Sequence, residues 1–176
     1  MKMKTVSPDY QIYIASLSDY NAGILHGKWI NVECATVDDI RDEINEILAN
    51  SPIAKKYGEP AEEYAIHDFE LGGIQISEYE DLTTIVSIAE ALLEHGEVFA
   101  IYYNYVSDLE TAKNTFEDAY QGEYDSFLAY ATETFDELYA HSIPENLRYY
   151  IDYNAFARDL EADGYFIEDG HVFRPV

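Results

Sequence analysis

Basic residues and cysteine are scarce in this sequence. Ten Lys and Arg residues stand against 35 Asp and Glu over 176 residues, which gives a formal net charge of −25 at pH 7. A charge of this sign and size excludes nucleic acid and anionic membranes as direct partners and favours a basic protein surface. The single cysteine, Cys34, excludes an internal disulfide bond and fits a reducing compartment.

Long hydrophobic runs are also missing. No stretch approaches the roughly 18 apolar residues of a membrane span, and the opening residues, MKMKTVSPDYQIYIASL, lack the apolar region of a secretory signal peptide. Apolar residues nevertheless make up 48% of the chain and aromatic residues 15%, whereas a disordered chain combines high charge with low hydrophobicity. We therefore expect a folded, cytoplasmic protein with no membrane partner.

No sequence pattern of a catalytic or metal site is present either. In residues 159–170, Asp159, Glu161 and Asp163 occupy alternate positions, as the ligands of a calcium-binding loop do. Gly170 takes the twelfth position, where such a loop needs a bidentate carboxylate. GILHGKW, at 23–29, has one residue too few for a phosphate loop and a tryptophan where serine or threonine is needed. The histidines form no zinc-binding pattern with each other or with Cys34. We predict that the protein is not an enzyme and uses no metal ion or cofactor.

Hydrophobic periodicity predicts a mixed α+β fold. Alternating apolar residues bounded by turn residues favour three strands, expected to pair in an antiparallel sheet, at 10–17, 27–33 and 63–71. Apolar residues at three- and four-residue steps predict a helix capped by Thr36 or Asp38 and stopped at Ser51-Pro52, and further helices at 77–96, 107–122, 124–140 and 152–164.

The segments between these elements carry turn and cap signals. Gly58 and Pro60 make residues 53–62 the best candidate for a linker. Ser107 and Glu110 have the spacing of a capping box for the helix at 107–122. Asp169-Gly170 predicts a hairpin over 165–175. Residues 97–106 are ambiguous, because their aromatic and β-branched content also suits a strand.

The helix at 124–140 combines an apolar stripe with a purely acidic face. We expect it to bury Phe127, Ala131, Phe135 and Leu138. Its other face, with the residues just before it, carries five carboxylates and no Lys or Arg, although like charges at four-residue spacing destabilise a helix. No Lys or Arg occurs between residues 56 and 113 or between 113 and 148, so the acidic excess is concentrated in the middle of the chain.

This pattern has a general and a specific interpretation. A halophile's surface or simple solubility accounts for acidity spread over the whole chain. Rows of carboxylates about 5–6 Å apart on helices would instead imitate backbone phosphates, and 25 charges correspond to about 42 Å of duplex DNA. The candidate partner-binding residues are seventeen acids of this central region: Glu62, Glu63, Asp68, Glu70, Glu78, Glu80, Asp81, Glu90, Glu94, Glu110, Glu117, Asp118, Glu123, Asp125, Glu133, Asp136 and Glu137.

Four stretches resemble the ArdA family of antirestriction proteins. They are IYIASLSDYNAGILHGKWI (12–30), AEEYAIHDFE (61–70), AYQGEYDSFLAYATETFDE (119–137) and YIDYNAFARDLEADGYFI (150–167). The segments SDYNAG and DYNAFARDL are the most specific, because they are not generic acidic sequence.

The resemblance implies a fold and a function. It implies an elongated homodimer of small α+β modules that mimics bent B-form DNA, and it implies that 97–106 is helical. We expect an N-terminal α+β module at 1–60, a mainly helical module at 61–106 and a C-terminal α+β module at 107–176 that dimerises. Such proteins occupy the DNA groove of type I restriction-modification enzymes, in their methyltransferase core, and block restriction.

Two alternatives remain open from the residues alone. A cation-binding module would need a stoichiometric cation site, which the pattern ending at Gly170 does not supply. An acidic decoy for a nucleoid protein or a polymerase shares every charge argument, and only the family resemblance disfavours it. Neither the charge nor the periodicity identifies which restriction enzyme is the target.

Overall fold

The computed structural model describes residues 10–176 and divides the chain into two compact units. Unit 1 ends at Asn104 and unit 2 runs from Tyr105 to Val176. Each unit contains helices and a small antiparallel sheet, so the predicted α+β class is confirmed. The division into three modules stays a prediction.

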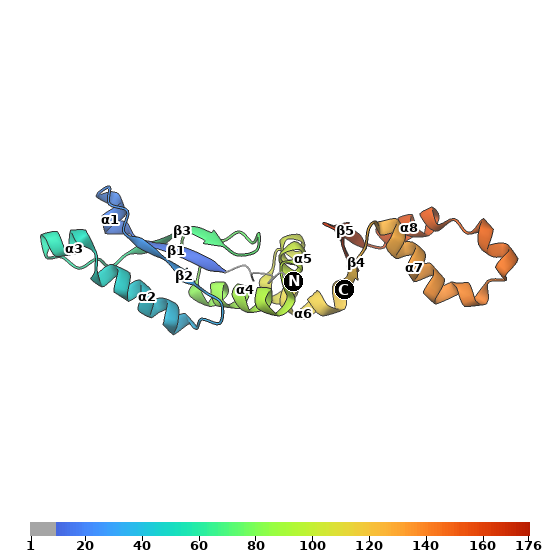
Figure 1. Cartoon of the computed structure of the whole chain (residues 1–176), viewed down its shortest axis with the longest axis horizontal. Helices are drawn as coiled ribbons and strands as arrows, with labels where there is room; N and C mark the ends of the chain where they lie inside the picture. The colour runs from blue at the N-terminus through green and yellow to red at the C-terminus, as the bar shows by residue number, and fades with distance from the viewer. Residues whose placement is uncertain (1–9) are drawn as a thin grey trace, which may run out of the picture. The chain divides into compact units, whose positions relative to one another are not determined.

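Unit 1 contains the predicted N-terminal sheet (Figure 1). Its strands are β1 (Gln11–Ser16), β2 (Gly27–Asn31) and β3 (Tyr64–Glu70), all antiparallel in the order β2-β1-β3. Ile12 and Ile14 of β1 are fully buried, whereas Tyr13 between them is partly exposed. The sheet is therefore covered on one face, as the alternation of the sequence predicts.

Two helices cover that face (Figure 1). In α2 (Val37–Ala49), Thr36 and Asp39 form a capping box, and Ile40, Ile44 and Ile47 are buried. In α4 (Leu82–His95), Asp81 is the cap, and the helix ends at Gly96, whose φ of 75° suits glycine. The helix predicted from residue 77 thus starts five residues later, because the Asp81 side chain accepts a hydrogen bond from the Thr83 amide.

The predicted linker at 53–62 is partly helical. Helix α3 (Pro52–Tyr57) starts after Ser51 and ends at Gly58, which has a left-handed conformation. Proline in the first turn and glycine just after the last are helix start and stop signals. The interpretation of residues 53–62 as a linker was therefore wrong for its first half, where Pro52 and Gly58 delimit a short helix.

A buried aspartate joins α3 to α1 (Leu17–Asn21). Asp19 is fully buried, and its Oδ1 accepts a hydrogen bond of 2.9 Å from the amide of Ile53. The Ser51 hydroxyl accepts from the amide of Ala54 at 3.1 Å. Pro52 has no amide hydrogen, so the free amides in the first turn of α3 are satisfied by these two side chains. Asp19 thereby connects segments 34 residues apart.

Residues 97–106 contain α5 (Val98–Val106), as the family resemblance implies. Phe99, Ala100 and Tyr102 are buried, and the Phe99 ring stacks with that of Tyr103 at 6.4 Å. Burial on a helical face outweighs the strand propensity of this segment.

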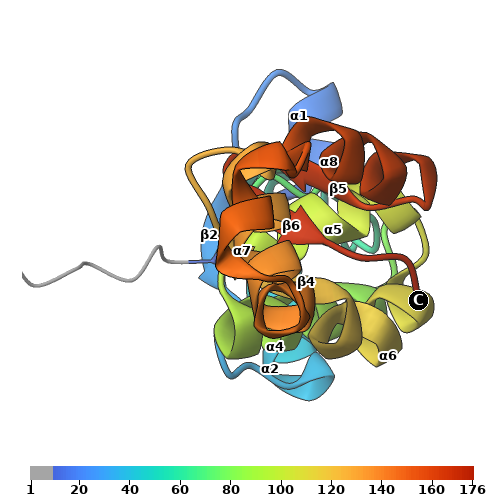
Figure 2. The same cartoon turned by 90° about the vertical axis from the view of Figure 1, so that its right-hand side faces the viewer.

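Unit 2 places its helices beside a second sheet (Figure 2). Its elements in chain order are α6 (Leu109–Ala119), β4 (Tyr120–Glu123), α7 (Phe127–Tyr139), the 3-10 helices η1 (Ala140–Ser142) and η2 (Glu145–Tyr150), α8 (Tyr153–Ala162), β5 (Phe166–Glu168) and β6 (His171–Phe173). The antiparallel strand order is β4-β6-β5. Residues Phe127, Tyr130 and Ala131 of α7 share a core with Ala157 of α8 and Val172 of β6.

The predicted hairpin is confirmed and gains a third strand. Asp169 and Gly170 connect β5 to β6 with φ values of 49° and 83°, the two positive angles of a tight hairpin turn. Residues 120–122, predicted as the end of a helix, form β4 instead. The rings of Phe116, Tyr120 and Phe173 contact one another there, so pairing with β6 is favoured over another helical turn.

The cap of α6 also differs from the prediction. Asp108, not Ser107, is the cap residue, and its carboxylate accepts a hydrogen bond of 2.8 Å from the amide of Thr111. Ser107 has a φ of 62°, a left-handed conformation that a cap residue does not adopt. The hydrogen bonds from Thr111 lower the pKa of Asp108, through its side chain first and its amide second.

Candidate functional site

The acidic face of α7 is exposed, as predicted. Ser126 caps the helix by accepting a hydrogen bond from the amide of Ala129. Glu133, Asp136 and Glu137 lie on its exposed side, where they line an open hollow with Ser126 and Leu128. The side chain of Asp136 is oriented by the Tyr153 hydroxyl, which donates to it at 2.7 Å. This face therefore presents carboxylates at three- and four-residue spacing to the solvent.

The apolar stripe of α7 is shorter than predicted. Phe127 and Ala131 are buried and Phe135 is half-buried, but Leu138 is 54% exposed. Tyr130, which was not among the predicted buried residues of this helix, is buried. The residues that cover this face come from α8 and the hairpin, and Leu138 is not among the residues packed against their core. The expected burial of Leu138 was wrong for that reason.

The other predicted acids are also at the surface. Of the seventeen candidates, Glu80 alone is half-buried, and the rest are exposed. They lie on both units: Glu62, Glu63, Asp68, Glu70, Glu78, Asp81, Glu90 and Glu94 on unit 1, and Glu110, Glu117, Asp118, Glu123, Asp125, Glu133, Asp136 and Glu137 on unit 2. Their assignment as phosphate surrogates stays a prediction.

Two of these acids have a structural role as well. Glu80 accepts hydrogen bonds of 3.1 Å from both the amide and the hydroxyl of Ser77. Asp81 caps α4, and the hydrogen bond from the Thr83 amide is the main reason why its pKa is lowered. Neutralising either residue would disturb the start of α4, so neither is suited to a test of surface charge alone.

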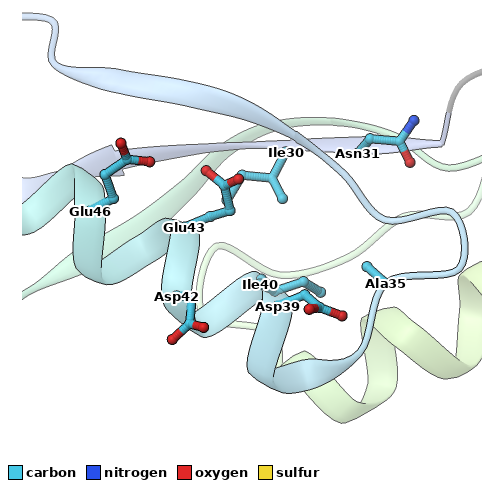
Figure 3. A pocket seen from close by; sticks show the side chains of 8 residues that line it. All are labelled: Ile30, Asn31, Ala35, Asp39, Ile40, Asp42, Glu43 and Glu46. Atoms are coloured by element: carbon cyan, nitrogen blue, oxygen red, sulfur yellow. The ribbon is translucent and has the colours of Figure 1, made fainter.

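Helix α2 carries a further acidic row, which the sequence interpretation missed. Asp39, Asp42, Glu43 and Glu46 line a hollow between α2 and β2 (Figure 3). Glu43 and Glu46 extend toward β2, where Lys28 pairs with both; the Lys28–Glu46 distance is 3.6 Å.

Two further acids of α2 also have hydrogen-bond or ion-pair partners. Arg41 pairs with Asp38 at 2.8 Å, and Asp39 is held by the capping box. The spacing within TVDDIRDEINEIL was visible in the sequence, but its one arginine and the neighbouring Lys28 made the row less conspicuous. The row is more nearly neutralised than the face of α7 because of these ion pairs.

Metal-binding clusters and membrane-spanning helices are both missing from the described residues. Within residues 10–176, no group of three or more His, Cys, Asp or Glu side chains is arranged to hold a metal ion. None of the helices in this part of the chain has the length and apolar character that crossing a bilayer requires.

The comparison with known families identifies what these surfaces belong to. The sequence profile described as "Antirestriction protein (ArdA)" matches residues 12–173, which is nearly the whole described chain. The chain belongs to the ArdA family of antirestriction proteins. No curated protein matches it.

Membership of the ArdA family gives the chain a general function. ArdA proteins are antirestriction proteins, so this chain acts against restriction-modification systems, and the family is not one of enzymes. The match covers both compact units, and with them every candidate acid from Glu62 to Glu137.

Proposed function

We propose that this ArdA protein is a DNA mimic, whose exposed carboxylates occupy the DNA-binding groove of a type I restriction-modification enzyme. The observation that carries the proposal is the excess of exposed carboxylates on α7 and the neighbouring elements, in a chain of net charge −25. A groove that binds DNA presents lysine and arginine at the spacing of phosphates, and affinity for it comes largely from releasing its counterions. Such contacts position the ligand without reading bases.

The proposal includes where and how inhibition occurs. We propose that the protein acts in the cytoplasm, on the methyltransferase core of the enzyme, and that it blocks DNA access by occupancy. Neither catalysis nor a cofactor is then needed, and the protein itself does not bind nucleic acid.

Competition for a methyltransferase core tests the proposal. We expect the protein to displace a fluorescent DNA duplex from a purified type I methyltransferase core stoichiometrically, with unchanged efficiency when a chelator is present. Displacement should weaken as salt is raised, because the contacts are electrostatic. Inactivation at substoichiometric amounts, or inhibition lost on chelation, would indicate catalysis or a metal requirement and contradict occupancy.

We also propose that the protein is a homodimer and that unit 2 supplies the interface. Five large apolar or aromatic side chains are exposed close together along the chain, at the end of α7 and in η2: Leu138, Tyr139, Leu147, Tyr149 and Tyr150. Tyr149 is 92% exposed and Tyr150 84%. Monomeric proteins rarely expose many such side chains together, and tyrosine is enriched in interfaces. A dimer would carry about −50, equivalent to about 85 Å of duplex.

Substitution in η2 should separate the protomers. Replacing Tyr149 and Tyr150 by serine is expected to raise the dimer dissociation constant at least tenfold, because two exposed aromatic anchors are lost. Analytical ultracentrifugation over a range of concentrations measures this shift. The double variant Tyr57→Ser and Tyr79→Ser, at exposed positions of unit 1, is the control and should leave the constant unchanged. A wild-type protein that is monomeric at high concentration would contradict the proposal.

A further inference from the structure

In the part of the chain that the structure describes, helices α2 and α4 leave one face of the N-terminal sheet uncovered, and this face carries an aromatic pair. Helices α2 and α4 lie on the opposite face (Figure 1). Tyr13 of β1 lies directly opposite Trp29 of β2, with ring centroids 5.5 Å apart in an edge-to-face arrangement. Trp29 is 39% exposed.

The Tyr13 ring lies over Gly27. A Cβ at Gly27 would lie 2.9 Å from the Tyr13 ring and 2.3 Å from the Ile14 carbonyl, so only glycine leaves room for this ring. The Tyr13 ring therefore packs closely on the backbone of Gly27, beside the Trp29 ring. A preorganised aromatic surface loses little conformational entropy when it binds a partner.

A bulge in β3 extends the aromatic surface. Tyr13 pairs with Asp68 and Ile14 with Ile66, so His67 is an extra residue in this strand. Tyr20 of α1 contacts the His67 ring edge-to-face, with centroids 4.5 Å apart. Tyr20 is itself exposed.

Carboxylates adjoin the aromatic rings, and the nearest lysine points elsewhere. Asp68 lies opposite Tyr13, and Glu70 two residues further on lies opposite Gln11, so both belong to the uncovered face. Lys28, the single cation in the three strands, pairs with Glu43 and Glu46 on α2 and so lies on the covered side. The uncovered face thus combines aromatic rings with negative charge.

Arginine is the side chain that suits this combination. Its planar guanidinium stacks on aromatic rings, pairs with carboxylates and loses less hydration energy than a lysine ammonium. Trp, Tyr and Arg are also the residues that most often dominate binding energy at protein interfaces.

We propose that the uncovered face of the N-terminal sheet is a docking surface for arginine side chains of a basic protein partner. Trp29 and Tyr13 supply the stacking surface, and Asp68 and Glu70 pair with the guanidinium. Identification of that partner as the restriction enzyme rests on the proposed function. The contact differs from the acidic helix faces because aromatic stacking contributes to it in addition to charge pairing.

The single tryptophan allows a direct test. Trp29 is the one tryptophan in the chain, so incorporation of 5-fluorotryptophan gives one ¹⁹F resonance. A ten-residue arginine peptide should shift this resonance clearly more than a ten-residue lysine peptide of equal charge. Equal effects of the two peptides, or no effect of either, would overturn the proposal. This comparison does not depend on the restriction enzyme.

The same label tests docking on the proposed target. Addition of a purified type I methyltransferase core should shift or broaden the Trp29 resonance. Formation of the complex with an unchanged resonance would overturn this inference but leave the proposed function intact. A resonance that shifts with protein concentration alone would assign the face to a second copy of the chain and likewise overturn it.

Substitution of Trp29 measures how much this side chain contributes to the affinity for the methyltransferase core. Trp29→Ala should weaken binding to the methyltransferase core about thirty-fold, as loss of an aromatic hot spot does, and Trp29→Phe should weaken it less. Both should leave the salt dependence unchanged, because no charge is altered. Leu93→Ala is the matched control, since Leu93 is 40% exposed on α4 and lies in the layer that covers the other face. Unchanged affinity in a folded Trp29→Phe and Trp29→Ala protein would contradict the proposal.

Discussion

Neutralising the acidic face of α7 should weaken binding to a type I methyltransferase core without unfolding the protein. Asp125, Glu133, Asp136 and Glu137 are all exposed, and replacement by Asn or Gln keeps their size. Exposed ion pairs contribute about 0.2–1 kcal/mol each, so the quadruple variant should lose about 0.8–4 kcal/mol and bind roughly fourfold to several hundredfold more weakly. Each single variant should lose only a few fold. The salt dependence should become less steep, because fewer counterions are released.

The fold should survive these changes. Glu133 and Glu137 are four residues apart on one helix face, and removing like charges at this spacing stabilises a helix. Asp136→Asn keeps a carbonyl oxygen that can accept the hydrogen bond of the Tyr153 hydroxyl. The thermal midpoint of the quadruple variant is therefore expected to equal or exceed that of the wild type.

A matched variant separates the position of the charges from their number. Glu59, Glu145, Glu161 and Glu168 are exposed glutamates outside the predicted set, and their replacement by Gln removes the same charge. This control should retain most of the affinity. An equal loss in both variants would mean that net charge alone matters, and unchanged affinity in the α7 variant would remove α7 from the mimic surface. Complete loss from one substitution would instead indicate a discrete hot spot.

Removing the Asp19 carboxylate should be the most destabilising single change to a charged residue. Asp19→Ala leaves the Ile53 amide without its acceptor and separates α1 from the start of α3. A buried donor left unpaired costs about 1–3 kcal/mol, so we expect a loss of about 2–3 kcal/mol in the free energy of unfolding. Urea denaturation followed by circular dichroism measures this loss.

The same carboxylate should make stability depend on pH in the acid range. Burial alone would raise the pKa of Asp19, but interactions with the side chains of Ser51 and Ser16 and with the Ile53 amide outweigh burial and lower it. Because the folded-state pKa is lower than the unfolded-state value of about 3.9, the stabilisation is complete above that value. It is lost as pH falls through the folded-state pKa.

Two variants show whether these effects belong to Asp19. Asp38→Ala, at an exposed position of α2 where the acid pairs only with Arg41, should change stability by less than about 0.5 kcal/mol. Asp19→Asn should keep an acceptor for Ile53 but lose the pH-dependent part of the stabilisation. A wild type and an Asp19→Asn protein with the same acid unfolding profile would contradict the role given to this charge.

The sequence alone determined the features that depend on neighbours within a few residues. The strand alternation around Ile12 and Ile14, the helical stripe of Ile40, Ile44 and Ile47 and the turn at Asp169-Gly170 are all local patterns. The exposure of the acids follows equally directly, because a carboxylate without a partner is too costly to bury. The α+β class and the acidic surface were therefore predictable from the residues, and the sequence resemblance to the ArdA family from four short stretches.

Only the tertiary structure decided the features that depend on distant segments. Asp19 looked like any acid in a turn, and its burial depends on the Ile53 amide, 34 residues away. Strand β4 exists because residues around position 172 pair with it, and Leu138 is exposed because no segment of its own unit covers it. The uncovered aromatic face of the N-terminal sheet has the same origin, since no local pattern states which side of a sheet the helices will cover. Local propensity fixes an element, whereas burial is decided by whichever remote side chains pack against it.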